Sequence, residues 1–305
     1  MLNENIFFRI YNKLNQLIPV LYLLLSFFVF LASGYFTYLK IYKDAINSQE
    51  THLIKMVNVY NDIFINYNLS LDALETKITY SNKKQPWTSQ ELISAYNRKI
   101  PTIRAILLFD KQGKQTAATF GTFTNVNISD RQYFINAAKG TYEHWYGPYN
   151  GRNDGALTFA LARRLEDTNK SFNGLISLTG EPKELDRICK TFNFNRALIT
   201  TLVETNSNKV ISYCVGNSKI NDLDKVGIDS NTLLPNNTKW HTLSNARNLQ
   251  VGIAISEKEI LNLWKEAFLH QFIFFFLSIF FALLAIITYL TRITNNNFNK
   301  HLYPL

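Results

Sequence analysis

The chain has 305 residues, 47% of them hydrophobic, and a formal net charge of +9. The charge is spread out: Glu4, Arg9 and Lys13 give +1 before residue 40, Arg292 and Lys300 give +2 after residue 266, and the remaining +6 lies between. No cluster of Lys and Arg is interleaved with aromatic residues, as nucleic-acid-binding surfaces require. We therefore expect no nucleic-acid partner.

Two apolar blocks hold much of the hydrophobic fraction. Residues 14–39 and 268–290 contain no Asp, Glu, Lys or Arg, and each exceeds the ~20 residues that a helix needs to cross a bilayer. A soluble core could bury such runs only in a larger helical protein, which the polar middle region does not suggest. We predict transmembrane helices over residues 14–39 and 267–290.

The flanks of these blocks predict their orientation, because Lys and Arg are enriched on the cytoplasmic side of a membrane. Residues 1–13 and 291–305 carry the excess and are expected in the cytoplasm, although Lys40 and Lys43 follow the first block. The region between the blocks then lies outside the cytoplasm. A signal peptide cleaved near residues 32–34 is the alternative, but the apolar run continues past that point, which favours an uncleaved anchor.

The first membrane helix leads into a long helix that we predict from Lys40 to about Tyr80, a stretch without Gly or Pro. Apolar residues recur in it at alternating spacings of four and three, which places them on one face of a helix. They are Leu53, Val57, Tyr60, Phe64, Tyr67, Leu71, Leu74 and Ile78. This face can pack on the domain's own sheet, or its start can pair with a second copy in a homodimer.

Runs of β-branched, aliphatic and aromatic residues bounded by turn residues predict strands. Five come first: 103–109, 115–120, 143–146, 157–163 and 174–178. Four more follow a helix predicted over 182–190: 198–203, 210–214, 240–243 and 249–255. We expect an α+β fold of antiparallel sheets, with one module over residues 40–190 whose helices lie on one side of its sheet. A smaller module, nearer the membrane, should occupy residues 191–266.

A short helix is predicted between the second and third strands of the first group, with Ser129 or Asp130 as its N-cap and Gly140 after its end. It carries Tyr133 and Phe134 on one side. Because these two rings lie at the start of the helix, they can shield a polar contact made there.

Arg131 should lie in the first turn of that helix, where the helix dipole disfavours a cation. A carboxylate, from the protein or from a ligand, is therefore expected beside it. A guanidinium next to two aromatic rings suits the carboxylate of a small molecule, which it can bind with two parallel hydrogen bonds. An ordinary ion pair with Asp130 or Glu143 is the alternative.

Cys189 and Cys214 are the only cysteines. An oxidising compartment would permit one disulfide between them, and two buried thiols are equally consistent with the sequence. Neither cysteine has a second cysteine or a histidine at ligand spacing, and no phosphate-binding loop, nucleophile elbow or zinc-binding helix motif occurs. We expect no metal, no cofactor and no enzymatic activity.

Four segments together resemble the extracytoplasmic Cache domain. They are residues 130–134 (Asp-Arg-Gln-Tyr-Phe), 147–148 (Gly-Pro), 157–163 and 172–178. The similarity covers about residues 40–262. Cache domains are the sensory domains of many bacterial chemoreceptors, sensor kinases and diguanylate cyclases. The resemblance implies a double Cache architecture of PAS-like sheet modules, in a two-pass protein of the bacterial inner (plasma) membrane.

The resemblance also implies a ligand site. In amino-acid-binding members, the arginine of an Arg-x-aromatic-aromatic motif binds the ligand carboxylate, and an aspartate on a later strand binds the amine. Here Arg131 matches, while Thr179 stands in place of the aspartate and Val126 where a tyrosine is often found. The resemblance therefore implies a ligand with a carboxylate, and this ligand need not be an amino acid. The candidate ligand-binding residues are Arg131, Tyr133, Phe134, Tyr149, Asp130, Tyr146 and Thr179.

These features favour a membrane-anchored sensor that binds a small carboxylate-bearing molecule outside the cytoplasm and passes a conformational signal to a cytoplasmic partner, which the sequence does not identify. Related receptors carry a cyclase, kinase or methyl-accepting domain after the second helix, whereas residues 291–305 are too few for one. An orphaned receptor is therefore one alternative. A membrane adaptor that docks another protein and binds no metabolite is another.

Overall fold

The computed structural model describes residues 2–81, 86–96, 100–120, 126–152, 154–192, 195–216 and 223–302. The chain forms two compact units: the helical segments up to Asp44 and from Glu257 onward make one, and Ala45–Ser256 make the other. This division separates the predicted membrane helices from the sheets.

Two long helices make the first unit. Helix α1 (Leu2–Thr79) continues without interruption for 78 residues and so reaches far into the second unit, as predicted. Helix α6 (Glu257–Leu302) has 46 residues. By length and composition, both are long and apolar enough to cross a membrane. A polar contact joins them, because Gln271 Nε2 donates a hydrogen bond of 2.8 Å to Thr37 Oγ1.

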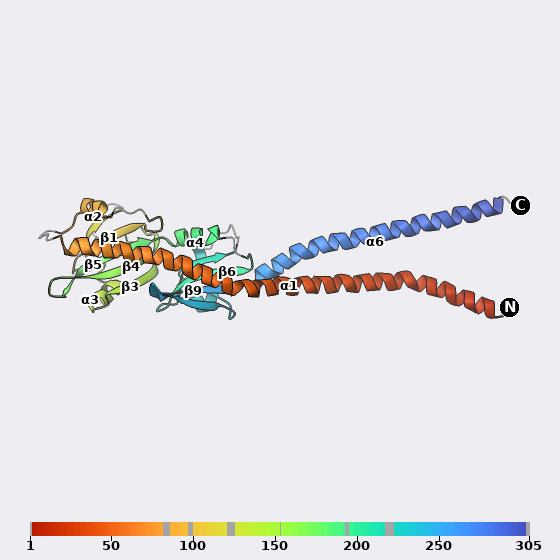
Figure 1. The fold of residues 1–305 in the computed structure, drawn as a ribbon, viewed down its shortest axis with the longest axis horizontal. Helices are drawn as coiled ribbons and strands as arrows, with labels where there is room; N and C mark the ends of the chain where they lie inside the picture. The colour runs from red at the N-terminus through yellow and green to blue at the C-terminus, as the bar shows by residue number, and fades with distance from the viewer. Residues whose placement is uncertain are drawn as a thin grey trace. The chain divides into compact units, whose positions relative to one another are not determined.

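The second unit begins with an antiparallel sheet in the order β2-β1-β5-β4-β3 (Figure 1). Its strands are β1 (Ala105–Phe109), β2 (Gln115–Ala118), β3 (Glu143–Asn150), β4 (Leu157–Glu166) and β5 (Phe172–Gly180). Helices α2 (Ser89–Ala95), α3 (Gln132–Ala138) and α4 (Pro182–Thr191) belong to the same unit. All five predicted strands are present. Strand β3 continues past its predicted end to Asn150, which brings Tyr149 into the sheet.

Helix α1 packs on one face of this sheet (Figure 1). The Phe64 ring lies 4.4 Å from Trp145 of β3, and the Tyr67 ring lies 6.2 Å from Phe159 of β4, measured between centroids. Seven residues of the predicted apolar stripe are buried: Leu53, Val57, Tyr60, Phe64, Tyr67, Leu71 and Leu74. The stripe thus packs on the core of its own domain, and a homodimer seam stays a prediction.

Helix α3 packs on the opposite face, so the prediction that all helices lie on one side of the sheet is wrong. The Phe134 ring of α3 lies 5.3 Å from Phe172 of β5, and α3 shares a hydrophobic cluster with Ala162 and Leu175. Neighbouring strand residues point to opposite faces, and β4 and β5 are buried at nearly every position. Such continuously apolar strands need cover on both faces.

A second antiparallel sheet follows, in the order β7-β6-β9-β8. Its strands are β6 (Leu198–Glu204), β7 (Lys209–Val215), β8 (Lys239–Leu243) and β9 (Ala246–Ile255), with a 3₁₀ turn at Leu223–Lys225 and helix α5 (Ser230–Leu233) before β8. The four strands were all predicted. Strand β9 leads directly into α6, so the second sheet is continuous in sequence with the second candidate membrane helix.

Two links hold the second sheet in place. Cys189 of α4 and Cys214 of β7 form a disulfide, with their Cα atoms 6.6 Å apart, which resolves the alternative left open by the sequence. In addition, Asn248 Nδ2 of β9 donates a hydrogen bond of 2.7 Å to the Trp145 carbonyl of β3. The second sheet is thus tied both to α4 and to the edge of the first sheet.

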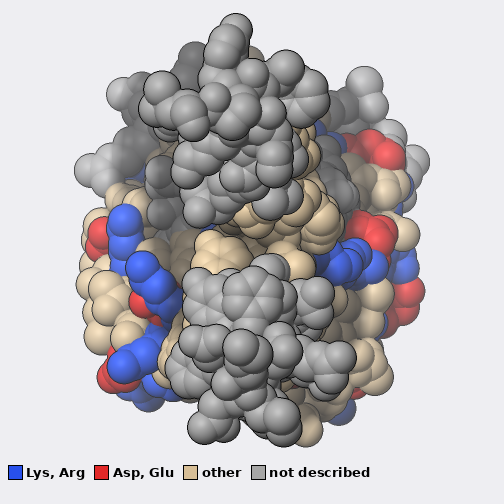
Figure 2. All heavy atoms as spheres, turned by 90° about the vertical axis from the view of Figure 1, so that its right-hand side faces the viewer, with Lys and Arg blue, Asp and Glu red and all other residues tan. Residues whose placement is uncertain are grey.

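On the face drawn in Figure 2, Lys and Arg side chains lie among Asp and Glu side chains. No single-sign patch forms there among the described residues. The dispersed charge of the sequence is therefore also dispersed on this face.

Candidate functional site

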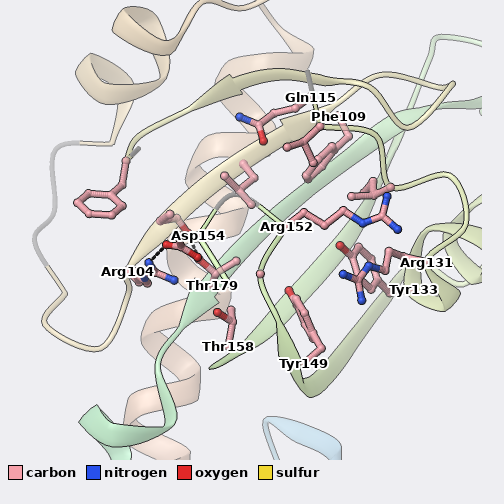
Figure 3. Close-up of a pocket in the computed structure, with 16 residues that line it drawn as sticks. Arg104, Phe109, Gln115, Arg131, Tyr133, Tyr149, Arg152, Asp154, Thr158 and Thr179 are labelled. Atoms are coloured by element: carbon pink, nitrogen blue, oxygen red, sulfur yellow. Dashed lines mark hydrogen bonds and ion pairs between the residues drawn. The ribbon is translucent and has the colours of Figure 1, made fainter. Parts of the chain in front are cut away.

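A cavity of about 200 Å³ opens on the α3 side of the first sheet (Figure 3). Ala105, Leu107 and Phe109 of β1 share this face, because alternate residues of a strand point the same way. Antiparallel pairing places Thr179 of β5 beside Ala105. The remaining wall comes from β2, β3 and β4, from the turn between β3 and β4, and from the start of α3 with the residues before it. The wall is therefore mostly apolar, with charged groups at a few points.

Arg131 lines this cavity from the N-cap position of α3, where its backbone is extended (φ −75°, ψ 135°). The prediction that it lies in the first helical turn behind a Ser129 or Asp130 cap is wrong. The helix begins at Gln132, and no side chain caps it. Ser129 and Asp130 form the preceding turn, which the Arg131 N–H closes on the Ile128 carbonyl (2.9 Å). The Asp130 carboxylate faces Arg152 instead of the helix.

The Arg131 guanidinium has no carboxylate partner among the described residues. Its Nη2 donates one hydrogen bond of 3.2 Å to the Asn150 carbonyl, and its Cζ lies 5.6 Å from the centroid of the Tyr149 ring. The ion-pair alternative fails because Asp130 pairs with Arg152 and Glu143 pairs with Arg163. Arg131 therefore keeps N–H donors that a ligand can use.

Two other arginines in the wall are already neutralised. Arg152 pairs with Asp130, and the hydrogen bond from Arg152 lowers the pKa of Asp130. Arg104 pairs with Asp154 and, through Nε at 2.8 Å, with Glu181. Figure 3 shows the pair of Arg104 and Asp154 on one side of the cavity and Arg131 on the other. The three guanidinium groups are thus not equivalent. Arg131 makes no ion pair among the described residues, because Asp130, which precedes it and interacts with it through charge, pairs with Arg152.

Tyr133 and Tyr149 form an aromatic wall beside Arg131, with ring centroids 5.8 Å apart and their hydroxyl groups hydrogen-bonded. Burial raises the pKa of Tyr133 to about 12 and outweighs the lowering effect of Arg131 and Arg152. Burial also raises the pKa of Tyr149. Both phenols are therefore neutral at physiological pH. One O–H is used in the hydrogen bond between them, so one O–H donor remains for an anion.

Four of the seven candidate residues line the cavity: Arg131, Tyr133, Tyr149 and Thr179. The other three do not. Phe134 is buried in the hydrophobic cluster under α3, and Asp130 is exposed and paired with Arg152. Tyr146 lines a neighbouring groove that also contains His144 and Glu204. A helix turns about 100° between consecutive residues, so Tyr133 and Phe134 point in different directions.

Arg104, Arg152 and Thr158 also line the cavity, and the sequence reasoning missed them as site residues. Arg104 directly precedes β1, and Arg152 lies in a turn rich in Gly and Asn. No local pattern marks either of them as a cavity residue, because the sheet brings them to the site from distant parts of the chain.

A metal site is not evident. Within the described ranges, no group of three or more His, Cys, Asp or Glu side chains could hold a metal ion. The chemistry that these residues can supply is charge pairing and hydrogen bonding.

No family model matches the chain, and no curated protein matches it. Solved structures do. The extracellular domain assigned to histidine kinase rpHK1S-Z16 is 18% identical over 71% of this chain and 98% of that chain, with a TM-score of 0.55. The ligand-binding domain of the Pseudomonas fluorescens chemoreceptor CtaA, solved with L-isoleucine, is 13% identical over 73% and 97%, with a TM-score of 0.53. That of the Pseudomonas aeruginosa chemoreceptor PctC, solved with GABA, is 10% identical over 68% and 98%, with a TM-score of 0.52.

These likenesses establish the fold. The chain has the α+β fold of the extracellular ligand-binding domains of chemoreceptors and histidine kinases, with a long N-terminal helix and two antiparallel sheet modules. The double Cache resemblance of the sequence is confirmed at this level.

Proposed function

We propose that this chain is a membrane-anchored sensor, not an enzyme, whose central domain lies outside the cytoplasm and binds a small carboxylate-bearing molecule in the cavity of the first sheet. One observation carries the proposal: Arg131 lines the cavity and has no carboxylate partner among the described residues. A partly desolvated cation without a counter-charge is unfavourable. A ligand carboxylate supplies that counter-charge.

The surroundings of Arg131 suit this ligand group. The guanidinium fork matches both oxygens of a carboxylate, and the hydrogen-bonded pair of Tyr133 and Tyr149 hydroxyl groups leaves one further O–H donor at the same place. The chemoreceptor domains of similar fold were solved with L-isoleucine and with GABA, and both of these molecules carry a carboxylate. The fold is therefore compatible with such ligands.

The placement outside the cytoplasm has two supports. The chain is bounded by two helices that are long and apolar enough to cross a membrane, and their outer flanks carry the Lys and Arg excess. The disulfide between Cys189 and Cys214 is of a kind that persists in oxidising compartments and is rare in the cytosol. We propose the inner membrane of a bacterium as the location.

The signal would leave the cavity through β5. Thr179 lines the cavity on one face of this strand, and the next residue, Gly180, meets α1 on the other face. A Cβ atom at Gly180 would lie 2.5 Å from the Tyr67 hydroxyl of α1, so only glycine permits this approach. A shift of β5 on ligand binding would therefore displace α1. Because α1 continues into the first candidate membrane helix, a shift of an ångström or two would reach the cytoplasmic side.

The test uses the full chain in lipid nanodiscs and a panel of small carboxylic acids. At least one acid should raise the midpoint of thermal unfolding. Replacing Arg131 by Gln should weaken its binding by about 1.5–3 kcal/mol, which is the value of a charge-assisted hydrogen-bonding pair. The matched control is Arg187→Gln, because Arg187 of α4 has a side chain that is 77% exposed. This variant should bind the acid as tightly as the wild type does.

Two outcomes would contradict the proposal. A ligand whose affinity is unchanged by Arg131→Gln would place the binding site elsewhere. The absence of any stabilising acid would favour the adaptor hypothesis, in which this domain docks a protein instead of a metabolite.

A further inference from the structure

The charged side chains of the cavity wall differ in whether they can still pair with a charged group of a ligand. Arg104, Arg131 and Arg152 line the cavity, and Asp154 is the one acid among its described lining residues. Among the described residues, the wall thus carries three arginines and one acid.

The carboxylate of Asp154 is already engaged. It pairs with Arg104 and accepts a hydrogen bond of 3.0 Å from the Ala156 N–H. Burial opposes ionisation of Asp154, but these hydrogen bonds outweigh that effect and lower its pKa. The two acids just behind the wall, Asp130 and Glu181, pair with Arg152 and Arg104 respectively. Asp154 and Glu181 share Arg104, and Glu181 also pairs with Lys183 (2.7 Å). Each of these three acids is thus paired with a cation.

The other polar groups of the wall are neutral. Thr158 Oγ1 donates to the Ala156 carbonyl (2.9 Å), and Thr179 Oγ1 donates to the Ala105 carbonyl (3.1 Å). Each hydroxyl oxygen keeps a lone pair that can accept a hydrogen bond from a ligand. Beside them lie apolar side chains such as Leu107 and Val126. This part of the wall suits an uncharged body that is apolar or carries a hydroxyl group.

A carboxylate and an ammonium group would meet opposite conditions here. The carboxylate finds Arg131, which makes no ion pair among the described residues. An ammonium group would find only carboxylates that already pair with cations, and it would enter a wall with three arginines. Taking a charge out of water without a counter-charge is costly, so the ammonium group should be rejected.

We infer that the ligand of this cavity is an acid with one carboxylate and no ammonium group, with an uncharged or hydroxylated body, and not an amino acid. The inference rests on the proposed function and narrows its ligand class. It separates this chain from the chemoreceptor domains of similar fold that were solved with amino acids.

The test compares acids of one carbon skeleton by calorimetric titration of the full chain in nanodiscs. Suitable sets are butanoate, 2-hydroxybutanoate, 2-aminobutanoate and 4-aminobutanoate, and the corresponding three-carbon and branched five-carbon acids. In the set that binds most tightly, the unsubstituted or hydroxy acid should bind at least tenfold more tightly than its amino counterpart. If an amino acid binds as tightly or more tightly, and binding is lost in Arg131→Gln, the inference is wrong while the proposed function stands. If no acid in any set binds, the proposed function fails with it.

A variant of the cavity wall tests why the cavity should exclude ligands with an ammonium group. Arg104→Gln removes the arginine from Asp154 and leaves Arg131 in place, so an acid without a cation now faces the cavity. The affinity for the amino acid, relative to the hydroxy acid, should rise several-fold over that in the wild type and in the control Arg187→Gln. An unchanged ratio in a variant that melts like the wild type would show that the pairing of Asp154 does not exclude ammonium groups, and would overturn the inference.

Discussion

Glu204 connects the two sheets through a single buried carboxylate. It ends β6, is 5% exposed, and accepts hydrogen bonds from the Asn206 and Ser207 N–H groups (3.0 and 2.8 Å). Asn248 Nδ2 donates to the same carboxylate (3.3 Å), and His144 Nε2 of β3 lies 3.7 Å away. Burial opposes ionisation and is the largest single effect, but the nearby His144 and the hydrogen bonds from Ser207 and Asn206 together lower the pKa of Glu204 to about 2.

This pKa predicts how stability depends on pH. An unfolded glutamate titrates near 4.5, so the ionised Glu204 contributes stability that is fully present above that pH and is lost as the pH falls towards about 2. Glu204→Gln should flatten the decline of the thermal unfolding midpoint between pH 4.5 and 2.5. The control Glu50→Gln, at a side chain that is 72% exposed, should keep the wild-type decline. Equal declines in all three proteins would show that Glu204 is not the group that titrates.

At the same scale, the sequence identified only part of the site. The Arg-x-aromatic-aromatic pattern located Arg131 and Tyr133, because such a pattern is local and lies at one end of one short helix. It could not show that Phe134 faces the core, since that depends on the angle at which α3 lies on the sheet. It also could not show that Arg152 competes with the helix for Asp130. Arg152 lies in a different turn, so the local sequence around Asp130 does not contain this pair.

Among the elements, α1 contributes most to the core. Phe64 is fully buried against Trp145, Tyr67 and Phe159. Phe64→Ala should destabilise the fold by about 3–5 kcal/mol, through lost burial and a residual cavity. The next residue, Ile65, is 43% exposed, so Ile65→Ala should change stability by less than about 0.5 kcal/mol. Chemical unfolding followed by tryptophan fluorescence measures both. Similar losses in the two variants would mean that α1 does not pack on this sheet through the predicted stripe.

The elements themselves were largely predictable, and the physical reason is periodicity. The four-and-three spacing along α1 and the short apolar runs of the strands are local signals, because they show which positions of each element face the core. Which faces of the first sheet the helices cover was not predicted correctly. The runs of β4 and β5 do not alternate between apolar and polar residues, and this lack of alternation is itself the sign of a sheet covered on both faces.

The whole molecule combines three features: two candidate membrane helices, a pair of sheets between them in sequence, and a cavity in which one arginine makes no ion pair among the described residues. The first sheet supplies the cavity and packs on α1, and the second sheet leads into α6. Each end of the central unit therefore continues into a candidate membrane helix. A ligand that moves the first sheet against α1 would therefore act on the connection to the first candidate membrane helix.

We predict that a ligand reaches Arg131 from outside the cytoplasm, and one binding measurement tests both the residue and the side of the membrane. A radiolabelled form of the tightest-binding acid is added to spheroplasts that produce the chain and, separately, to sealed inverted membrane vesicles. We predict saturable binding to the spheroplasts, none to the inverted vesicles, and none to spheroplasts that produce Arg131→Gln. Binding to inverted vesicles alone, or binding that survives the loss of the Arg131 guanidinium, would contradict the account.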